Sequence, residues 1–259
     1  MQPSSYKHGS NKVLCDVSGW FVSEKLDGMK GRWIDGNMFT RSGHELKIPD
    51  WFRQLLPKRD IEGELYFGPN TFHHTASLRA TSKQILSTVW DKVSFRVFDV
   101  VDYSLIWMER QVELLELFPT STERISIVKW EAVNTPKDVE NQFQRVLKKG
   151  GEGVIIADPW GLYKDGHVES ILKYKALHER EAIITGYQTG NENRLKSLIV
   201  RDVDRENIQF NIGTGLKLAE RFDYEKKFPI GAMVSYNYEL LGANGKPRTP
   251  IFKGVRIDL

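Results

Sequence analysis

The sequence predicts an α+β domain over residues 1–177, with antiparallel sheets and flanking helices, followed by a small all-β barrel over residues 178–259. Three observations support this expectation. Apolar and polar residues alternate in several segments of the first part, two segments there have helical spacing, and the last part contains strand-like segments alone. With 259 residues, 40% of them hydrophobic, the chain is long enough for two cores.

The bulk composition is that of a soluble globular protein. The net charge of +3 is spread evenly, which permits nucleic-acid binding without requiring it. The sequence contains no run of about 18 or more apolar residues, so we expect no membrane span. The polar N-terminal segment lacks the apolar core of a secretory signal. Cys15 is the only cysteine, which excludes an internal disulfide and favours a reducing intracellular compartment.

The first domain opens with strands. "WFVSEKL" indicates a strand that runs into an Asp-Gly turn, and "GRWIDGNMFTRSG" indicates two strands joined at Asp35-Gly36, a strong hairpin signal. In "RDIEGELYF" the apolar residues alternate with Glu62 and Glu64, so we expect the two glutamates on one face of a strand. "VSFRVFDVV" is apolar enough for a buried strand.

Helices and further strands complete the chain. "MERQVELLELF" and "PKDVENQFQRVLKKG" have helical spacing, Gly150-Gly151 end the second helix, and "GVIIAD" and "ILKYKAL" are strands again. We expect the domain boundary near Ala176–Arg180, where "ALHER" has neither a strand nor a capped helix. Five strands then follow between short polar turns, which is typical of a small barrel such as the oligonucleotide-binding (OB) fold: "EAIITGYQ", "SLIVRDV", "NIQFNIG", "AMVSYNYELLG" and "TPIFKGVRI".

Lys25, in "SEKLDGMKG", is the first candidate for chemistry. A protonated lysine is a poor nucleophile, but neighbouring cations such as Lys30 and Arg32, or a bound metal, would lower its pKa. Taken alone, the same pattern also fits a solvated lysine in an ordinary turn.

Other charged residues have two interpretations each. Glu62 and Glu64 suit a site or an exposed strand edge. Glu152 lies in "KKGGEGVII", where flanking glycines leave the carboxylate open to Mg²⁺, although a plain loop glutamate fits too. Lys173 and Lys175 alternate on a strand and suit a polyphosphate or a solvated sheet edge.

Two further segments also have two interpretations each. Phe98, in "FRVFDV", fits a core position or a ring that stacks on a base. The terminal "KPRTPIFKGVR" is either a phosphate-binding segment or a solvated basic tail, and it gathers Lys246, Arg248, Lys253 and Arg256.

In sequence order these segments are similar to the motif series of the covalent nucleotidyltransferases: "EKLDG", "TRSG", "EGELYF", "FRVFDV", "GEGVII", "LKYK" and "PRTPIFKGVR". Within that superfamily the chain most resembles the minimal ATP-dependent DNA ligases, including the small E-type bacterial enzymes and the small viral and phage ligases. "VSEKLDG", the hairpin that follows it and "IPDWF" are especially similar to the E-type group. The resemblance runs from about Gly19 to Arg256.

The resemblance implies a fold and an activity. Residues 1–177 would form an adenylation domain and residues 178–259 an OB-fold domain. The enzyme would seal 5′-phosphate/3′-hydroxyl nicks in duplex DNA through a lysyl-AMP intermediate and adenylated DNA. Its cofactors would be ATP and Mg²⁺, with Mn²⁺ as an alternative, and its partner nicked double-stranded DNA. We expect an intracellular monomer without membrane contact, in the cytoplasm, the nucleoid or a viral replication compartment.

The resemblance also implies residue roles. Lys25 would be adenylated on its ε-amine, Glu152 would bind the divalent metal together with Glu64, and Arg41 would contact the 5′-phosphate of the nick. The other motif residues would surround the nucleotide: Glu24 at the adenine pocket, Glu64 at the ribose, Phe98 stacked on adenine, Lys173 and Lys175 at the α-phosphate, and Arg256 with Lys253 or Arg248 at the pyrophosphate.

The chain departs from the family pattern at Lys30, where the family usually has arginine. We expect Lys30 to contribute to cofactor binding, yet a lysine cannot make a bidentate phosphate contact. Arg32 lies two residues on and could share its strand face. We therefore count Arg32 among the DNA-binding residues, together with Arg79 and Lys83 in the loop "GPNTFHHTASLRATSK".

Rival functions share part of this residue set. An RNA ligase or an mRNA-capping guanylyltransferase would also use Lys25, Glu64, Glu152 and the lysine pair. The E-type similarity is evidence against capping, and the terminal basic motif is evidence against many RNA ligases. A non-enzymatic DNA-binding OB-fold protein is the third alternative, which the joint presence of these residues disfavours.

Overall fold

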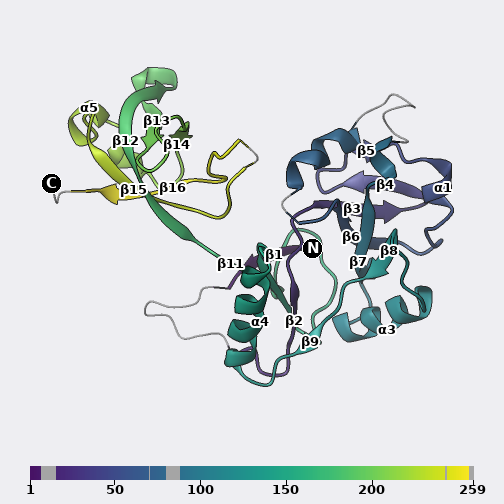
Figure 1. The fold of residues 1–259 in the computed structure, drawn as a ribbon. Coiled ribbons are helices and arrows are strands. Elements are labelled where there is room, and N and C mark those ends of the chain that lie inside the picture. The colour runs from purple at the N-terminus through teal and green to yellow at the C-terminus, as the bar shows by residue number, and fades with distance from the viewer. Residues whose placement is uncertain (7–15, 70, 80–87, 243, 257–259) are drawn as a thin grey trace. The chain divides into compact units, whose positions relative to one another are not determined.

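The computed structural model describes residues 1–6, 16–69, 71–79, 88–242 and 244–256. The chain divides into two compact units, Met1–Lys175 (unit 1) and Ala176–Leu259 (unit 2) (Figure 1). Two sheets and most of the described helices belong to unit 1, and a third sheet belongs to unit 2. The predicted α+β class is therefore confirmed. No described helix is long and apolar enough to cross a bilayer.

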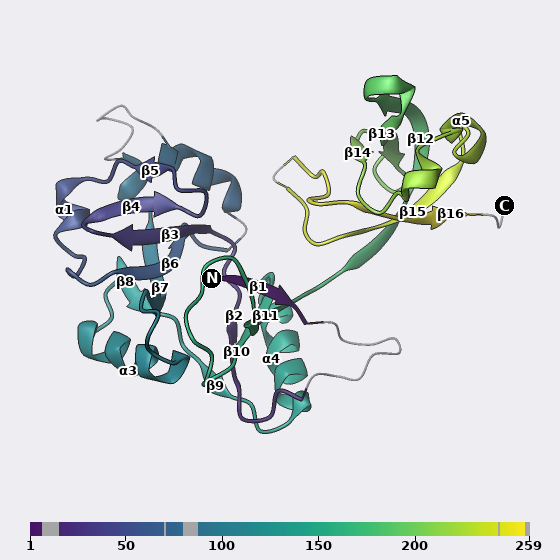
Figure 2. The same cartoon turned by 180° about the vertical axis from the view of Figure 1, so that it is seen from behind.

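Sheet 1 of unit 1 is antiparallel except at one edge, where its first two strands run parallel. In spatial order its strands are β1 (Gln2–Ser5), β11 (His167–Lys175), β10 (Gly153–Ala157), β2 (Phe21–Glu24) and β9 (Glu131–Ala132). Helix α4 (Pro136–Lys148) packs on β2 and β10, as Figures 1 and 2 show. The helix begins where Asp138 accepts a hydrogen bond from the Thr135 N–H at 2.8 Å.

Sheet 2 of unit 1 is also antiparallel, apart from the parallel pair β7–β8. In spatial order its strands are β5 (Glu45–Leu46), β4 (Asn37–Thr40), β3 (Met29–Ile34), β6 (Ile61–Tyr66), β7 (Ser94–Val100) and β8 (Ile125–Ile127). Asp35 and Gly36 both have positive φ, which is the geometry that the hairpin signal predicts. The helical segments of this part are α1 (Asp50–Arg53), η1 (Phe72–Arg79) and α3 (Trp107–Leu117).

The two faces of sheet 2 have opposite character. One face is buried in a hydrophobic core that includes Trp33, Leu65 and Phe95. On the other face, residues opposite one another in the ladder form charged cross-strand pairs: Lys30–Glu64, Glu64–Arg96 and Arg32–Glu62. Alternation in "EGE" thus puts both glutamates on the charged face, as the sequence predicts.

Gly63 separates these glutamates at a point of close approach between strands. A Cβ there would lie 2.7 Å from the Arg96 carbonyl oxygen and 2.6 Å from the Phe95 ring. Such distances leave no room for a side chain, so a glycine between the two glutamates keeps β6 tight against β7.

Unit 2 contains sheet 3, whose strands in spatial order are β14 (Gln209–Ile212), β13 (Leu195–Asp202), β12 (His178–Thr189), β15 (Met233–Tyr238) and β16 (Ile251–Val255). Its own core includes Ile184, Leu198 and Val234. An isolated bridge between Thr214 and Ile251 links the end of β14 to β16. The described strands form an OB-like sheet with this one link, and no continuous ladder closes it into a barrel.

Two details of unit 2 differ from the expectation. The segment "ALHER" was expected to contain no strand, but β12 begins at His178, so only Ala176 and Leu177 separate it from β11. The unit was also expected to contain strands alone, yet its turns include three short helical segments: η2 (Asn191–Asn193), η3 (Leu218–Glu220) and α5 (Tyr224–Lys227). Segments of three or four residues are too short for a periodic pattern.

Candidate active site

Lys25 follows the last residue of β2 and is held in place by its backbone. Its N–H donates to the Gly153 carbonyl at 2.8 Å, which extends the pairing of β2 with β10. The turn after it is held by Glu64, whose Oε1 accepts a hydrogen bond from the Gly28 N–H at 3.1 Å. The backbone around Lys25 is therefore anchored between the end of sheet 1 and the charged face of sheet 2.

Glu152 lies between two lysines. Lys25 Nζ is 2.5 Å from Oε2, and Lys175 Nζ is 2.5 Å from Oε1. Burial would raise the pKa of Glu152, but Lys25 and Lys175 outweigh that effect and hold the pKa below its usual value. The structure thus brings together three predicted site residues that lie up to 150 positions apart in the chain. Lys173 lies two residues before Lys175 on β11 and shares its strand face.

Glu64 has a contrasting environment. Burial raises its pKa to about 7, Lys25 opposes this rise, and the negative charge of Glu152 adds to it. The two carboxylates are therefore close enough to interact. Because one titrates near neutral pH and the other stays ionised, they form an uneven pair of the kind found at functional sites.

Replacement of Glu64 by Gln should change how stability depends on pH. Between pH 4.5 and about 7 the folded protein keeps a proton on Glu64 that the unfolded chain has released, so stability falls as pH rises through this window. We expect the free energy of unfolding of the wild type to fall relative to E64Q by about 3 kcal/mol from pH 4 to pH 8. Urea unfolding of both proteins without nucleotide or metal measures this; parallel pH profiles would refute it.

Lys30 and Arg32 are not arranged around Lys25 as the sequence suggested. Both project from β3 toward Glu62, with Lys30 Nζ 2.6 Å from Oε2 and Arg32 Nε 2.8 Å from Oε1. Their charges therefore neutralise a buried carboxylate, and in this structure the direct charged neighbour of Lys25 is an anion. Lys30 also lies over the ring of Phe98, with Nζ 5.8 Å from the centroid, so Phe98 faces the charged side of sheet 2.

Strand alternation separates Glu24 from Lys25. Glu24 lies beside Gly151, where an added Cβ would be 3.2 Å from its Oε1, on the side of β2 that α4 covers. Ser23, in contrast, shares the face of Lys25; it is 2% exposed, and its Oγ has no hydrogen-bond partner within the described residues. Sequence analysis missed Ser23, although its position two residues before Lys25 was a usable signal.

Two of the residues expected to contact DNA lie at the surface of the described part of unit 1. Arg41 is exposed in the turn between β4 and β5, and Arg79 is exposed at the end of η1. Neither has an ion-pair partner in the described part of the chain. Lys83 lies outside the described residues.

In unit 2, two of the three cations predicted for the pyrophosphate, Lys253 and Arg256, form ion pairs with glutamates. Lys253 Nζ lies 2.6 Å from Glu179 Oε2, and Arg256 Nη1 lies 2.9 Å from Glu181 Oε1. All four side chains are at least a third exposed, so these contacts cost little to break.

Glu152 and Glu64 are suited to bind a divalent cation whose remaining ligands come from water and from a bound nucleotide. Within the described residues no group of three or more His, Cys, Asp or Glu could hold a metal ion. Glu152 and Glu64 supply two carboxylates near each other, and Mg²⁺ characteristically takes one or two carboxylates together with water and substrate phosphates.

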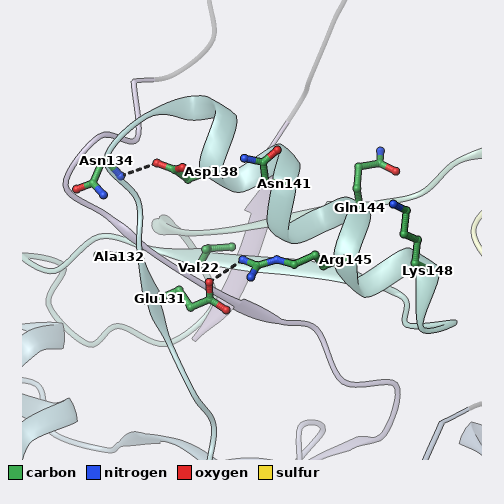
Figure 3. A pocket seen from close by; sticks show the side chains of 9 residues that line it. All are labelled: Val22, Glu131, Ala132, Asn134, Asp138, Asn141, Gln144, Arg145 and Lys148. Carbon is green, nitrogen blue, oxygen red and sulfur yellow. Dashed lines mark hydrogen bonds and ion pairs between the residues drawn. The ribbon is translucent and has the colours of Figure 1, made fainter.

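A separate polar pocket of about 520 Å³ lies between α4 and the edge of sheet 1 (Figure 3). It is lined by Val22, Glu131, Ala132, Asn134, Asp138, Asn141, Gln144, Arg145 and Lys148. Figure 3 shows the ion pair between Arg145 and Glu131 across it, at 2.7 Å. None of the residues predicted for chemistry lines this pocket, so we place the site at Lys25.

Comparisons with known proteins agree with this geometry. The family described as "ATP dependent DNA ligase domain" matches residues 51–175, and "DNA ligase OB-like domain" matches residues 188–256. A DNA ligase from Haemophilus influenzae is 31% identical over 236 residues, which is 90% of this chain and 85% of that protein.

Solved structures show the same fold. One from a structure-function study of Lig E DNA ligases has a TM-score of 0.85 and 27% identity, over 99% of this chain and all of that one. The adenylated Chlorella virus DNA ligase has a TM-score of 0.53 at 24% identity, over 99% of both chains. The ordered motifs, the Lys25–Glu152–Lys175 cluster and these matches lead to one conclusion: the chain belongs to the small ATP-dependent DNA ligases.

Proposed function

We propose that this ligase seals 5′-phosphate/3′-hydroxyl nicks in duplex DNA, with Lys25 as the residue that carries AMP. The observation that carries the proposal is the contact of Lys25 with Glu152, 2.5 Å long, beside Lys175. A nucleophile, an acceptor for its proton and a cation for a phosphate are thereby combined in one partly buried cluster.

The first step transfers AMP from ATP to the protein. Lys25 Nζ forms a bond to the α-phosphorus, the bond to pyrophosphate breaks, and Glu152 Oε2 is the group in reach to accept the lysine proton. Lys175 and Lys173 stabilise negative charge on the α-phosphate oxygens. A divalent metal, when bound by Glu152 and Glu64, supplies further positive charge at these oxygens.

The nucleoside would lie against the charged face of sheet 2. Phe98 stacks on adenine, Glu64 accepts a hydrogen bond from the ribose, and the buried Ser23 Oγ gains a partner in the base. Lys30 and Glu24 remain at the border of this pocket. Lys253 and Arg256 in unit 2 orient the pyrophosphate once it displaces their glutamate partners.

In the later steps AMP passes to the 5′-phosphate of the nick, and the 3′-hydroxyl displaces it. Each step exchanges one phosphoryl bond for another, so cations supply most of the catalysis. Arg41, Arg32, Arg79 and Lys83 are the proposed DNA contacts. We expect one protein molecule to act on one nick.

The test is a two-stage assay on the wild-type protein. Incubation with α-labelled ATP and Mg²⁺ should label the protein, whereas α-labelled GTP should not. A nicked DNA duplex should then be sealed, and a nicked RNA duplex should react much more slowly. Labelling by GTP would favour a capping enzyme, and sealing of RNA alone would favour an RNA ligase. Absence of any labelled protein would refute the proposal.

A further inference from the structure

Glu62 is the centre of a buried charged cluster next to the proposed site. Its side chain is 1% exposed, and Lys30, Arg32 and the hydroxyl of Tyr163 all contact it. The amino group of Met1 lies 3.5 Å from Oε2. Burial would raise the pKa of Glu62, but Lys30, the Met1 amino group and the Tyr163 hydroxyl hold the pKa below its usual value, so the carboxylate stays ionised.

The ammonium group of Lys30 is already paired inside the protein. Its Nζ is 2.6 Å from Glu62 and 2.9 Å from the Met1 carbonyl oxygen, and its side chain is only 15% exposed. At the position where the family usually has arginine, this chain therefore has a lysine whose contacts are with other residues of the protein.

Arg32 is arranged differently, because contacts hold only one edge of its guanidinium. Nε forms an ion pair with Glu62 Oε1 at 2.8 Å without the alignment of a hydrogen bond, and Nη2 donates to the Tyr163 hydroxyl at 3.5 Å and to Asp165 at 3.4 Å. Nη1 has no partner among the residues that the structure describes, and the side chain is 28% exposed. A guanidinium held along one edge presents the other in a fixed direction.

Tyr163 is itself held from several sides. It is 1% exposed, and its hydroxyl donates to Glu62 Oε1 at 2.7 Å, which turns an oxygen lone pair toward Arg32. Arg110 donates to the Gly161 carbonyl at 3.1 Å and fixes the loop that carries Tyr163. Asp165, in the same loop, accepts a hydrogen bond from the Tyr103 hydroxyl at 2.6 Å.

We infer that Arg32 takes the phosphate contact that Lys30 cannot make, with Nη1 directed at a phosphate of the nicked strand, and that Tyr163 and Asp165 are positioning residues for Arg32. The inference rests on the proposed function, because it assigns a DNA contact to a nick-sealing enzyme. It explains how a lysine is tolerated at position 30: the neighbouring arginine on the same strand face is oriented by a loop from sheet 1.

The experiment uses three variants of the full chain and one control. Tyr163→Phe removes only the hydroxyl, Asp165→Asn only the charge, and Arg32→Ala the proposed contact itself. The control is Tyr187→Phe, which removes a hydroxyl bonded to the Phe228 carbonyl at 2.7 Å in unit 2. For each variant we would measure the rate of Lys25 adenylation, kcat and KM for nicked DNA, and the Kd for nicked duplex by fluorescence anisotropy, which requires no catalysis.

We expect R32A to raise the Kd and KM for nicked DNA about 100-fold and Y163F about tenfold, with D165N about threefold because Asp165 is exposed. Adenylation of Lys25 should stay within about twofold of wild type in Y163F and D165N, and Y187F should match wild type. In the R32A background, Y163F should cause no further loss, because the hydroxyl acts only through Arg32.

Either of two results would overturn the inference. The first is that R32A and Y163F lower the affinity for nicked DNA additively in the double variant. The second is that Y163F lowers the rate of Lys25 adenylation as much as it lowers DNA affinity, which a merely structural role of Tyr163 would produce. If the wild type formed no lysyl-AMP, the proposed function would fail by itself, and the Kd values would still decide the role of Arg32.

Discussion

Lys25→Ala should abolish formation of lysyl-AMP, with a loss of at least about a thousandfold, because no other described amine touches Glu152 Oε2. Lys25→Arg should be equally inactive, since a guanidinium keeps its proton and does not attack phosphorus. The measurement is the amount of labelled protein after incubation with α-labelled ATP and Mg²⁺, followed by peptide mapping of the labelled residue.

The control for Lys25 is Lys149→Ala, which removes an exposed lysine at the end of α4 and should leave labelling unchanged. K25A should also still join a nick whose 5′-phosphate already carries AMP, because that step needs no lysine nucleophile. Wild-type labelling in K25A would show that another residue carries the nucleotide.

Arg110→Met should lower the free energy of unfolding by about 3–5 kcal/mol. Arg110 is fully buried, and its guanidinium donates to both oxygens of Asp99, at 2.7 and 3.1 Å, and to the carbonyls of Leu105 and Gly161. Methionine fills much of the same space but leaves the Asp99 carboxylate buried without its cation. Urea unfolding at neutral pH is the measurement.

An exposed ion pair between α4, the other long helix of unit 1, and β9 provides the matched control. Arg145 and Glu131 are 2.7 Å apart but 57% and 51% exposed, so Arg145→Met should cost about 0.5 kcal/mol or less. Equal losses for the two variants would mean that burial does not set the strength of these pairs, and would contradict the prediction.

Much of the fold was accessible from the sequence because local patterns fixed it. Alternation in "RDIEGELYF" predicted which face of β6 carries Glu62 and Glu64, and the Asp35-Gly36 turn predicted the hairpin. In unit 2 the strands were predicted but the short helical segments were not, since one turn of helix has no periodicity of its own.

The site could be predicted only as a set of residues. Motif order predicted Lys25, Glu152 and Lys175, but the two contacts that join them depend on how β2, β10 and β11 pair. Helical spacing gave no sign that Arg110 is buried, because its partner Asp99 lies on a strand of sheet 2. Pairing between distant segments also explains why Tyr163 was missed.

The Glu152 carboxylate, with one lysine on each oxygen, has a consequence for which anions can enter. Its negative charge cancels one of the two positive charges, so inorganic phosphate or chloride meets a weaker attraction than two bare lysines would exert. A phosphate that approaches alone must compete with a carboxylate already in contact with both ammonium groups. When a phosphate arrives together with a divalent cation, the cation can bind Glu152 in place of the lysines, and both lysines can then bind the phosphate. We therefore expect the cluster to bind metal-complexed nucleotides in preference to the simple anions that surround it.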